Sequence, residues 1–320
     1  MLKDNVFQIF ICGTGNNSDY LLRNNLGGVI FFTRDIEEEQ QFKDLITDIK
    51  RKSKTPPFLS IDQEGGRVER TENLHERYLS PMVAYKKGTD FLKSQTDTIL
   101  NELKSYGINM NFAPCLDVNS NPNNPIIGER AFSDNPTDVI NGYDTVFPLY
   151  QKAEIIPVIK HFPGHGDADK DSHKELPKIE LPRKTMEEIH IKPFKHAIKN
   201  GADAVMVAHL HATCFDKTEL PTSLSKNCIN YLNNTLGFNG VVISDDMYMK
   251  GVAKYGMTEA CLMGIDAGIN LFIYRDSSDQ VVEVIENTIR SAERDTSLRN
   301  KIEQSAEKIS RLKAKYNIGK

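Results

Sequence analysis

Short apolar segments recur along the chain, and longer stretches with a helical spacing of apolar residues lie between them. The apolar segments are rich in Val, Ile and Phe on both faces, which is typical of parallel strands that helices cover on each side. We expect a strand in each of eight segments: Val6–Cys12, Gly28–Phe32, Phe58–Asp62, Asn109–Pro114, Pro157–Phe162, Ala204–Leu210, Val241–Asp245 and Asn270–Tyr274.

The stretches between these segments read as amphipathic helices. Asn135 and Ser278 precede two of them and are residue types that cap the first free N–H groups of a helix. A last helix is expected over Thr296–Tyr316, packed on the outside of the molecule. The other helices are predicted at Ile36–Lys52, Phe91–Tyr106, Asp138–Lys152, Met186–Lys199, Ser225–Leu236 and Gln280–Ala292.

Strand and helix alternate eight times, which predicts an α/β fold of the (β/α)8 TIM-barrel class. A doubly wound open sheet is the alternative. It needs a phosphate-binding glycine fingerprint after an early strand, and the GTGNN sequence at Gly13–Asn17 does not match one. With no linker or repeat in view, residues 1–320 are expected to form a single catalytic barrel domain.

The composition excludes several classes of protein. The 320 residues carry 40 Lys and Arg against 44 Asp and Glu, and this net charge of −4 without a basic block argues against binding to nucleic acid or an anionic membrane. No apolar run approaches the roughly 20 residues needed to cross a bilayer. The first residues lack the pattern of a signal peptide. Five scattered cysteines suggest reduced thiols, so we expect a cytoplasmic protein without structural zinc.

Three long connections follow predicted strand ends, and polar residues stand where five of the strands stop. In a barrel these ends meet at one mouth, where long loops build the site. A charged residue at the end of an apolar strand is costly unless it is solvated or paired, so several together indicate a functional site. The connections are Gln63–Lys87, Leu116–Pro136 and Pro163–Arg183, and the polar residues are Asp62, Asp117, Lys160, His161, His209 and Asp245.

The densest group of reactive side chains runs from Lys160 to Asp167 and continues with Asp171 and His173. Its two glycines allow a sharp turn out of the strand. A carboxylate two residues from an imidazole can accept from one ring nitrogen and make the other more basic. Asp171 and His173 therefore form a candidate proton shuttle near neutral pH.

Asp245 ends the seventh strand in the sequence Ser244-Asp245-Asp246-Met247. A carboxylate at a strand end is held rigidly, as a covalent nucleophile must be. Because side chains alternate along a strand, Asp246 is expected to point elsewhere and to have a structural role.

These motifs together resemble the bacterial β-N-acetylglucosaminidases of glycoside hydrolase family 3. The resemblance rests on Lys160–Gly166 (KHFPGHG) with the following Asp-Ser-His, on Ile61–Arg70 (IDQEGGRVER) and on Ser244–Met247 (SDDM), in the order of the family. It implies a one-domain barrel that removes terminal, non-reducing β-linked N-acetylglucosamine, notably from 1,6-anhydro-muropeptides during cell-wall recycling in the cytoplasm.

The resemblance also implies roles for individual residues. Asp245 matches the nucleophile of a retaining mechanism, and His173 matches an unusual general acid/base with Asp171 as its partner. Substrate-binding roles are implied for Asp62, Arg70, Arg130, Lys160 and His161, and His209 is taken as a further barrel-end residue that touches sugar or loop. No cofactor or metal is expected, the partner is a small carbohydrate, and a monomer is compatible with the composition.

Other readings remain open from the sequence. A metal-dependent, amidohydrolase-like barrel would use histidines as ligands. A non-catalytic sugar-binding barrel, phosphorolysis in place of hydrolysis, and attack by the substrate's own N-acetyl oxygen are further alternatives. The histidines available to a metal are His161, His165, His173, His209 and His211.

Overall fold

The computed structural model describes residues 2–168 and 176–319. Eight parallel strands close into a barrel in the order β1-β10-β9-β7-β5-β4-β3-β2. The predicted (β/α)8 barrel is therefore confirmed. The strands are β1 (Phe10–Gly13), β2 (Gly28–Phe31), β3 (Phe58–Ile61), β4 (Met110–Asn111), β5 (Ile156–Phe162), β7 (Ala204–Val207), β9 (Val241–Asp246) and β10 (Leu271–Tyr274).

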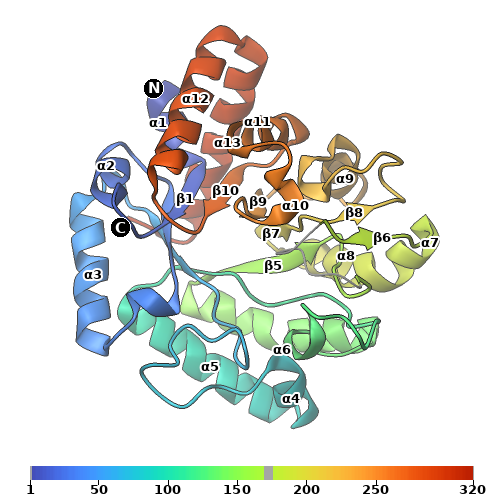
Figure 1. Cartoon of the computed structure of the whole chain (residues 1–320). Helices are drawn as coiled ribbons and strands as arrows, with labels where there is room; N and C mark the ends of the chain where they lie inside the picture. Colours follow the sequence, from blue (N-terminus) through green and yellow to red (C-terminus); the bar gives the residue numbers. More distant parts are fainter. Residues whose placement is uncertain (1, 169–175, 320) are drawn as a thin grey trace.

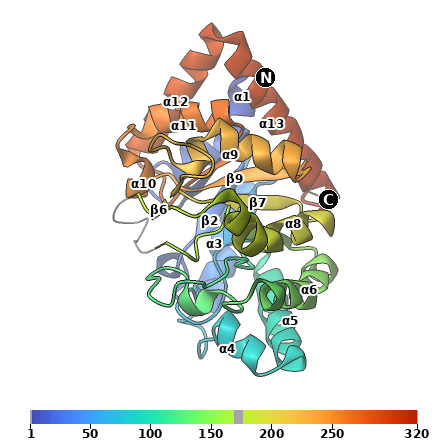
Figure 2. The same cartoon turned by 90° about the vertical axis from the view of Figure 1, so that its right-hand side faces the viewer.

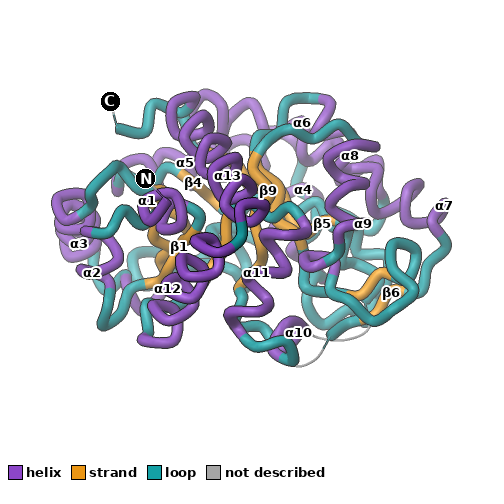
Figure 3. Tube along the Cα trace, turned by 90° about the horizontal axis from the view of Figure 1, so that it is seen from above, coloured by secondary structure: helices purple, strands orange, loops and turns teal. Residues whose placement is uncertain are grey.

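Helices surround the strands on the outside of the barrel (Figure 3). Each strand is followed by at least one of them, as the alternation along the sequence predicts. In strand order they are α2 (Ser18–Arg23), α3 (Glu39–Lys52), α4 (Pro81–Lys86) with α5 (Thr89–Tyr106), α6 (Pro136–Ala153), α7 (Arg183–Thr185) with α8 (Ile191–Lys199), α9 (Lys226–Asn230), α10 (Lys250–Ala253) with α11 (Met257–Ala267), and α12 (Asp279–Arg294).

The helix α3 illustrates how the sequence pattern sets the packing. Its buried residues Phe42, Ile46 and Ile49 lie on one face, at the spacing of a helical stripe. The ring of Phe42 meets Phe31 of β2 edge-on at 5.1 Å between centroids and Tyr106 of α5 at 5.4 Å. The strand and both neighbouring helices are thus joined by one aromatic cluster.

The prediction of a strand over Val6–Cys12 is wrong in its first half. Helix α1 covers Leu2–Gln8, and β1 begins at Phe10. Val6 and Phe7 are buried on the helix rather than in the sheet. A short apolar run does not by itself distinguish the end of a buried helix from the start of a buried strand.

The first and last helices of the chain pack together on the outside of the barrel (Figure 1). Helix α1 packs against α12 and against α13 (Thr296–Lys315), the predicted outer helix. The Asp295 side chain caps α13 by accepting from the backbone N–H groups of Ser297 and Leu298.

Several smaller elements differ from the predictions. The expected helices Met186–Lys199 and Ser225–Leu236 each include a π-helical turn, at η3 (Met186–His190) and η5 (Tyr231–Thr235). Helices α2, α4, α10 and α11 were not foreseen. Beside the barrel, β6 (Lys178–Ile179) pairs with β8 (His211–Ala212) in a separate two-stranded sheet. Figure 2 shows β6 on the flank of the barrel with α9 and α10 above it.

Within the described parts of the chain, no helix is long and apolar enough to cross a membrane.

Candidate active site

The carboxyl ends of the strands surround a pocket with about 900 Å³ of empty space, which we call the sugar-sized pocket. Five strands, or the residues directly after them, place charged or aromatic side chains in its wall. The pocket brings together most of the residues that the strand-end pattern predicts. Lining it are Phe32 after β2, Asp62 after β3, Lys160 and His161 of β5, Asp245 and Asp246 of β9, Arg275 after β10, and Arg70, Arg130 and His165 from the loops.

Oppositely charged groups form a chain of ion pairs along one side of this pocket. The Lys160 ammonium lies 2.7 Å from Asp62 Oδ1 and 2.5 Å from Glu64 Oε1. Arg130 binds the Glu64 carboxylate in a bidentate pair, with Nε 2.9 Å from Oε2 and Nη2 2.8 Å from Oε1. Arg70 approaches the other Asp62 oxygen at 3.9 Å. Such charge-assisted contacts hold these donors and acceptors in fixed orientations.

The imidazole of His161 is oriented by a buried carboxylate. Asp117 Oδ2 accepts from His161 Nδ1 at 2.7 Å, and the Asp117 oxygens also accept from the backbone N–H groups of His161 and His165. Because Arg130 can only donate, its Nη2 at 3.2 Å makes Nε2 of His161 the acceptor. His161 is thus held with its proton on Nδ1. Asp117, whose role the sequence left undecided, is a positioning residue.

Asp245 lies at the mouth end of β9 and is half-buried. Burial alone would raise the pKa of Asp245, but the imidazoles of His161 and His209 and the backbone N–H of Asp246, 2.8 Å from Oδ1, offset this and lower it. The carboxyl group is therefore ionised at neutral pH, the state in which a carboxylate can act as a nucleophile.

The expectation that Asp246 points away from the site is wrong, because both neighbouring carboxyl groups line the pocket. The β9–β10 pairing shifts here, so that Leu271 pairs with Ile243 but Ile273 pairs with Asp246. This bulge adds a residue to β9 and interrupts the alternation of side chains. Burial raises the pKa of Asp246 to about 6, and the charge of Asp245 adds to the rise.

A second bulge explains why two consecutive residues of β5 line the pocket. Ile159 pairs with Val205 and Phe162 pairs with Val207, which leaves one extra residue on β5 between these pairs. Lys160 and His161 lie in this interval. Without the bulge one of the two side chains would face the helices.

The glycine loop after β5 is attached to the loop after β4. A Cβ atom on Gly166 would collide with the carbonyl group of Val118, so glycine is required for this close approach. Asn124 Nδ2 donates to the carbonyl oxygens of His165 and Ala168 at 2.9 Å each. These contacts fix the start of the segment that continues to Asp171 and His173. Those two residues lie outside the described residues.

Two further histidines take different places. His209 is buried and does not line the pocket, and its Nδ1 lies 2.6 Å from Ser223 Oγ. His211 belongs to the small sheet, where Nε2 lies 2.9 Å from the carbonyl oxygen of Asp216. His209 thus lies near Asp245 without sharing the wall of the sugar-sized pocket.

Sequence reasoning missed Glu64, Phe32 and Arg275. Glu64 stands inside the quoted motif IDQEGG, two residues after Asp62, and this proximity was the available signal. Its pairing with Arg130, 66 positions further along the chain, cannot be read from a local pattern.

The alternative of a metal-dependent barrel has limited support from the described side chains. In the described ranges, one group of three ligand atoms lies within 4.8 Å, contributed by Cys115, Asp117 and His161. These groups already bind one another, with Cys115 Sγ 3.2 Å from Asp117 Oδ2. Burial holds the pKa of the Cys115 thiol well above its ordinary value, which opposes formation of the thiolate that a metal prefers.

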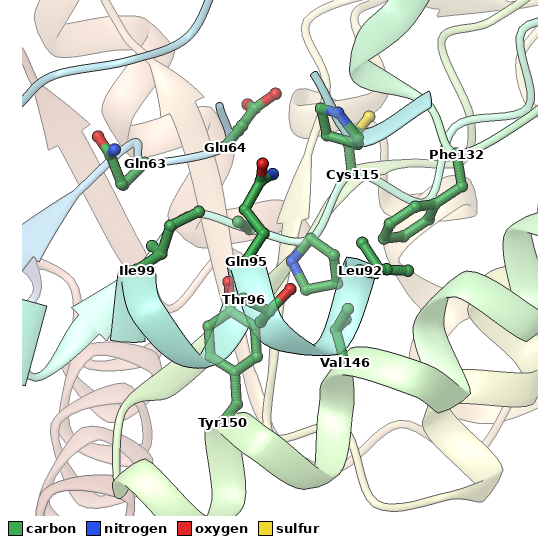
Figure 4. A pocket seen from close by; sticks show the side chains of 13 residues that line it. Gln63, Glu64, Leu92, Gln95, Thr96, Ile99, Cys115, Phe132, Val146 and Tyr150 are labelled. Carbon is green, nitrogen blue, oxygen red and sulfur yellow. The ribbon is translucent and has the colours of Figure 1, made fainter. Parts of the chain in front are cut away.

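A second, narrower cavity lies behind the site, between the β3 and β4 ends and helices α5 and α6 (Figure 4). It encloses about 450 Å³ and is lined by the stem of Glu64 together with Gln95, Thr96, Cys115 and Tyr150, among mainly apolar residues. Figure 4 shows the Glu64 carboxylate turned away from Gln95 and Thr96. Glu64 therefore separates this cavity from the sugar-sized pocket.

Comparison with known proteins decides the family. Residues 4–312 match the model described as the glycosyl hydrolase family 3 N terminal domain. The chain belongs to glycosyl hydrolase family 3. The resemblance read from its three motifs is confirmed.

Relatives within family 3 share about a third of the sequence. Beta-hexosaminidase A of Pseudoalteromonas piscicida is 31% identical over 277 residues, which cover 79% of this chain and 46% of that protein. Beta-hexosaminidase of Tolumonas auensis is 31% identical over 275 residues, covering 84% and 81%. The chain thus spans about half the length of the first relative and most of the second.

A solved family 3 structure has the same fold over nearly the whole chain. It is a glycoside hydrolase family 3 beta-N-acetylglucosaminidase from Paenibacillus sp. str. FPU-7, with a TM-score of 0.93 and 30% sequence identity. The match covers 99% of this chain and 63% of that one.

Proposed function

We propose that the chain is a retaining exo-β-N-acetylglucosaminidase that releases terminal, non-reducing β-linked N-acetylglucosamine. The observation that carries the proposal is the ionised carboxylate of Asp245, in the same pocket as Asp62, Arg130 and Lys160. A retaining enzyme needs such a carboxylate beneath the anomeric carbon and a fixed set of groups that bind the sugar hydroxyls. The names of the family 3 relatives agree with this activity.

In the proposed mechanism Asp245 attacks the anomeric carbon and forms a covalent glycosyl-enzyme. His173, oriented by Asp171, donates a proton to the departing oxygen and later takes one from the attacking water. The support for this pair is the sequence motif and the attachment of the preceding glycine loop. An imidazole suits the role near neutral pH, because no carboxylic acid need stay protonated there.

The binding groups have separate tasks in this proposal. Asp62 accepts hydrogen bonds from sugar hydroxyls, while Lys160 and Arg130 donate. His161, with its proton held on Nδ1 by Asp117, offers Nε2 as an acceptor beside Arg130. Because these side chains are already held in place before substrate binds, little side-chain entropy is lost on binding.

Replacement of Asp245 tests the proposal directly. Asp245→Ala should abolish turnover of an aryl β-N-acetylglucosaminide, and mass spectrometry of the wild-type chain treated with a slow fluorosugar should find the adduct on Asp245. Asp246→Asn is the matched control and should still form the adduct. Full activity of Asp245→Ala, or an adduct on another residue, would contradict the assignment.

The role of His173 has its own signature. His173→Ala should lose far more activity on a substrate with a sugar leaving group than on one with an activated aryl leaving group, because only the former needs protonation. Equal losses on both substrates would argue against acid catalysis by this residue. Added inorganic phosphate, with the product identified as sugar or sugar phosphate, distinguishes hydrolysis from phosphorolysis.

We further propose that the natural substrates are 1,6-anhydro-muropeptides in cytoplasmic cell-wall recycling. The motif resemblance supports this setting. The test compares kcat/KM for an N-acetylglucosaminyl anhydro-muropeptide with that for chitobiose, and a clear preference for chitobiose would contradict it.

A further inference from the structure

Glu64 is a buried carboxylate in contact with two of the cations that line the sugar-sized pocket. We propose that Glu64 is a positioning residue, whose negative charge holds Arg130 and Lys160 in the places where they bind the sugar. This inference rests on the proposed function, because its kinetic test measures cleavage of an N-acetylglucosaminide. It goes beyond that function by assigning affinity for the sugar to a residue that does not line the pocket.

The contacts leave the two cations little freedom. Arg130 binds both Glu64 oxygens through Nε and Nη2, at 2.9 and 2.8 Å, which fixes the plane of the guanidinium group. Lys160 Nζ lies 2.5 Å from the oxygen that Nη2 also contacts. One carboxylate therefore sets the separation between a planar cation and a point cation.

Burial makes the charge of Glu64 necessary rather than merely favourable. The side chains of Glu64 and Lys160 are each 1% exposed, so water cannot replace the carboxylate as their partner. Burial alone would raise the pKa of Glu64, but the charges of Arg130 and Lys160 hold it well below its ordinary range. Glu64 is ionised throughout the pH range in which a glycosidase is assayed.

The geometry separates the role of Glu64 from direct substrate binding. Arg130 and Lys160 line the sugar-sized pocket, whereas the stem of Glu64 lines the cavity behind it (Figure 4). Without the charge of Glu64, Asp62 is left as the anionic partner of Lys160, from which it is 2.7 Å away. An Asp62 drawn further toward Lys160 is a poorer acceptor for a sugar hydroxyl.

The substitution Glu64→Gln removes the charge and keeps the shape. The expected result is a rise of roughly 10- to 100-fold in KM for an aryl β-N-acetylglucosaminide, the range of one or two charge-assisted hydrogen bonds. The inhibition constant of N-acetylglucosamine should rise in parallel, and kcat should change less. An unchanged KM would overturn the proposal. A lower kcat with an unchanged KM would also overturn it, because a smaller fraction of folded enzyme gives that result.

Glu69→Gln is the matched control. Glu69 is buried in the same loop, but it binds Gln63 and Thr71 rather than a residue of the sugar-sized pocket. We expect its KM to stay within about twofold of wild type. A KM increase equal to that of Glu64→Gln would mean that any loss of charge in this loop has the same effect, and would count against a specific role.

A double-mutant cycle tests whether Glu64 acts through Lys160. If it does, Glu64→Gln added to Lys160→Met should reduce kcat/KM by much less than the product of the two single effects. Multiplicative losses would contradict the proposal. If Glu64→Gln does not fold, Glu64→Asp carries the same test, since the shorter carboxylate cannot reach both cations and KM should still rise.

Failure of this inference can be told apart from failure of the proposed function. A wild-type chain that does not cleave the aryl sugar refutes the function. Calorimetric binding of N-acetylglucosamine to wild type, Glu64→Gln and Glu69→Gln then tests Glu64 without turnover. Equal affinities of all three chains for the sugar would refute the positioning role.

Discussion

Asp117 is a buried carboxylate that accepts from four donors: Cys115 Sγ, the backbone N–H and Nδ1 of His161, and the backbone N–H of His165. Burial alone would raise its pKa, but His161 and His165 offset this and hold the pKa well below its ordinary range. A carboxyl group with a depressed pKa stabilises the fold above its ordinary pKa of about 4, and that contribution is lost as the pH falls below this value.

Asp117→Asn should therefore destabilise the protein by roughly 2–4 kcal/mol at pH 7, because an amide cannot accept from all of these donors. The difference from wild type should shrink as the pH falls below about 4, because the unfolded wild-type chain then binds a proton at this carboxyl group while the folded chain does not. Chemical denaturation at several pH values measures both effects. The exposed Asp134 in the same loop offers a control, and its replacement by Asn should change stability by less than about 0.5 kcal/mol.

At this scale the sequence predicts which residues gather but not how they pair. Asp62, Lys160, His161 and Asp245 could be placed at one mouth, because parallel strands end on the same side of a barrel. Glu64 could not be assigned, since its partners come from distant loops and strands. Nothing local in the sequence distinguishes a substrate contact from a turn former at Asp117, and the structure shows it as the acceptor that orients His161.

At the scale of elements, the eight strands could be predicted because both faces of each are buried and their residues are accordingly apolar. The two bulges could not. They depend on the pairing of β5 with β7 and of β9 with β10, and they decide that Lys160 and His161, and likewise Asp245 and Asp246, share one pocket. Strict alternation gave the wrong orientation for Asp246.

The outer helix α13 carries a buried lysine at the opposite end of the barrel from the sugar-sized pocket. Lys313 Nζ donates to Gln8 Oε1 at 2.9 Å and lies 4.9 Å from the ring centroid of Phe58, the first residue of β3. Burial lowers the pKa of Lys313 to about 7. Between this value and its ordinary pKa the unfolded chain binds more protons, so stability rises with pH across that window.

We expect Lys313→Met to raise the free energy of unfolding at pH 7 by at least about 1 kcal/mol, since the stem is kept and the buried charge is removed. The rise in stability between pH 7 and 10 should be smaller than in wild type. Denaturation curves across this range measure both quantities. Lys315→Met, at an exposed position paired with Asp203, serves as the control and should keep the wild-type pH dependence. A less stable Lys313→Met would show that the contacts of the ammonium outweigh its burial.

At the scale of the whole molecule, alternation of strands and helices was enough to predict the closed barrel. The sequence did not predict the small β6–β8 sheet, the packing of α1 against α12 and α13, or the cavity behind Glu64. Each of these depends on contacts between segments that lie far apart along the chain.

The family and the pocket also lead to a prediction about metals. Cys115, Asp117 and His161 are engaged with one another, and the proposed mechanism needs no cation. Exhaustive chelation followed by dialysis should leave activity on an aryl β-N-acetylglucosaminide unchanged. Loss of activity that returns with zinc would instead favour the metal-dependent reading.

The pocket draws the groups proposed to bind the sugar mainly from β3, β5 and the loop after β4, and its proposed nucleophile from β9. If the chain were severed between β5 and β7, the first fragment would carry most of the recognition residues and the second would carry Asp245. Turnover would then report reassembly of the two fragments, because neither holds both parts of the chemistry. Under the proposed function, the activity of the two mixed fragments would therefore measure how well the halves of the barrel associate.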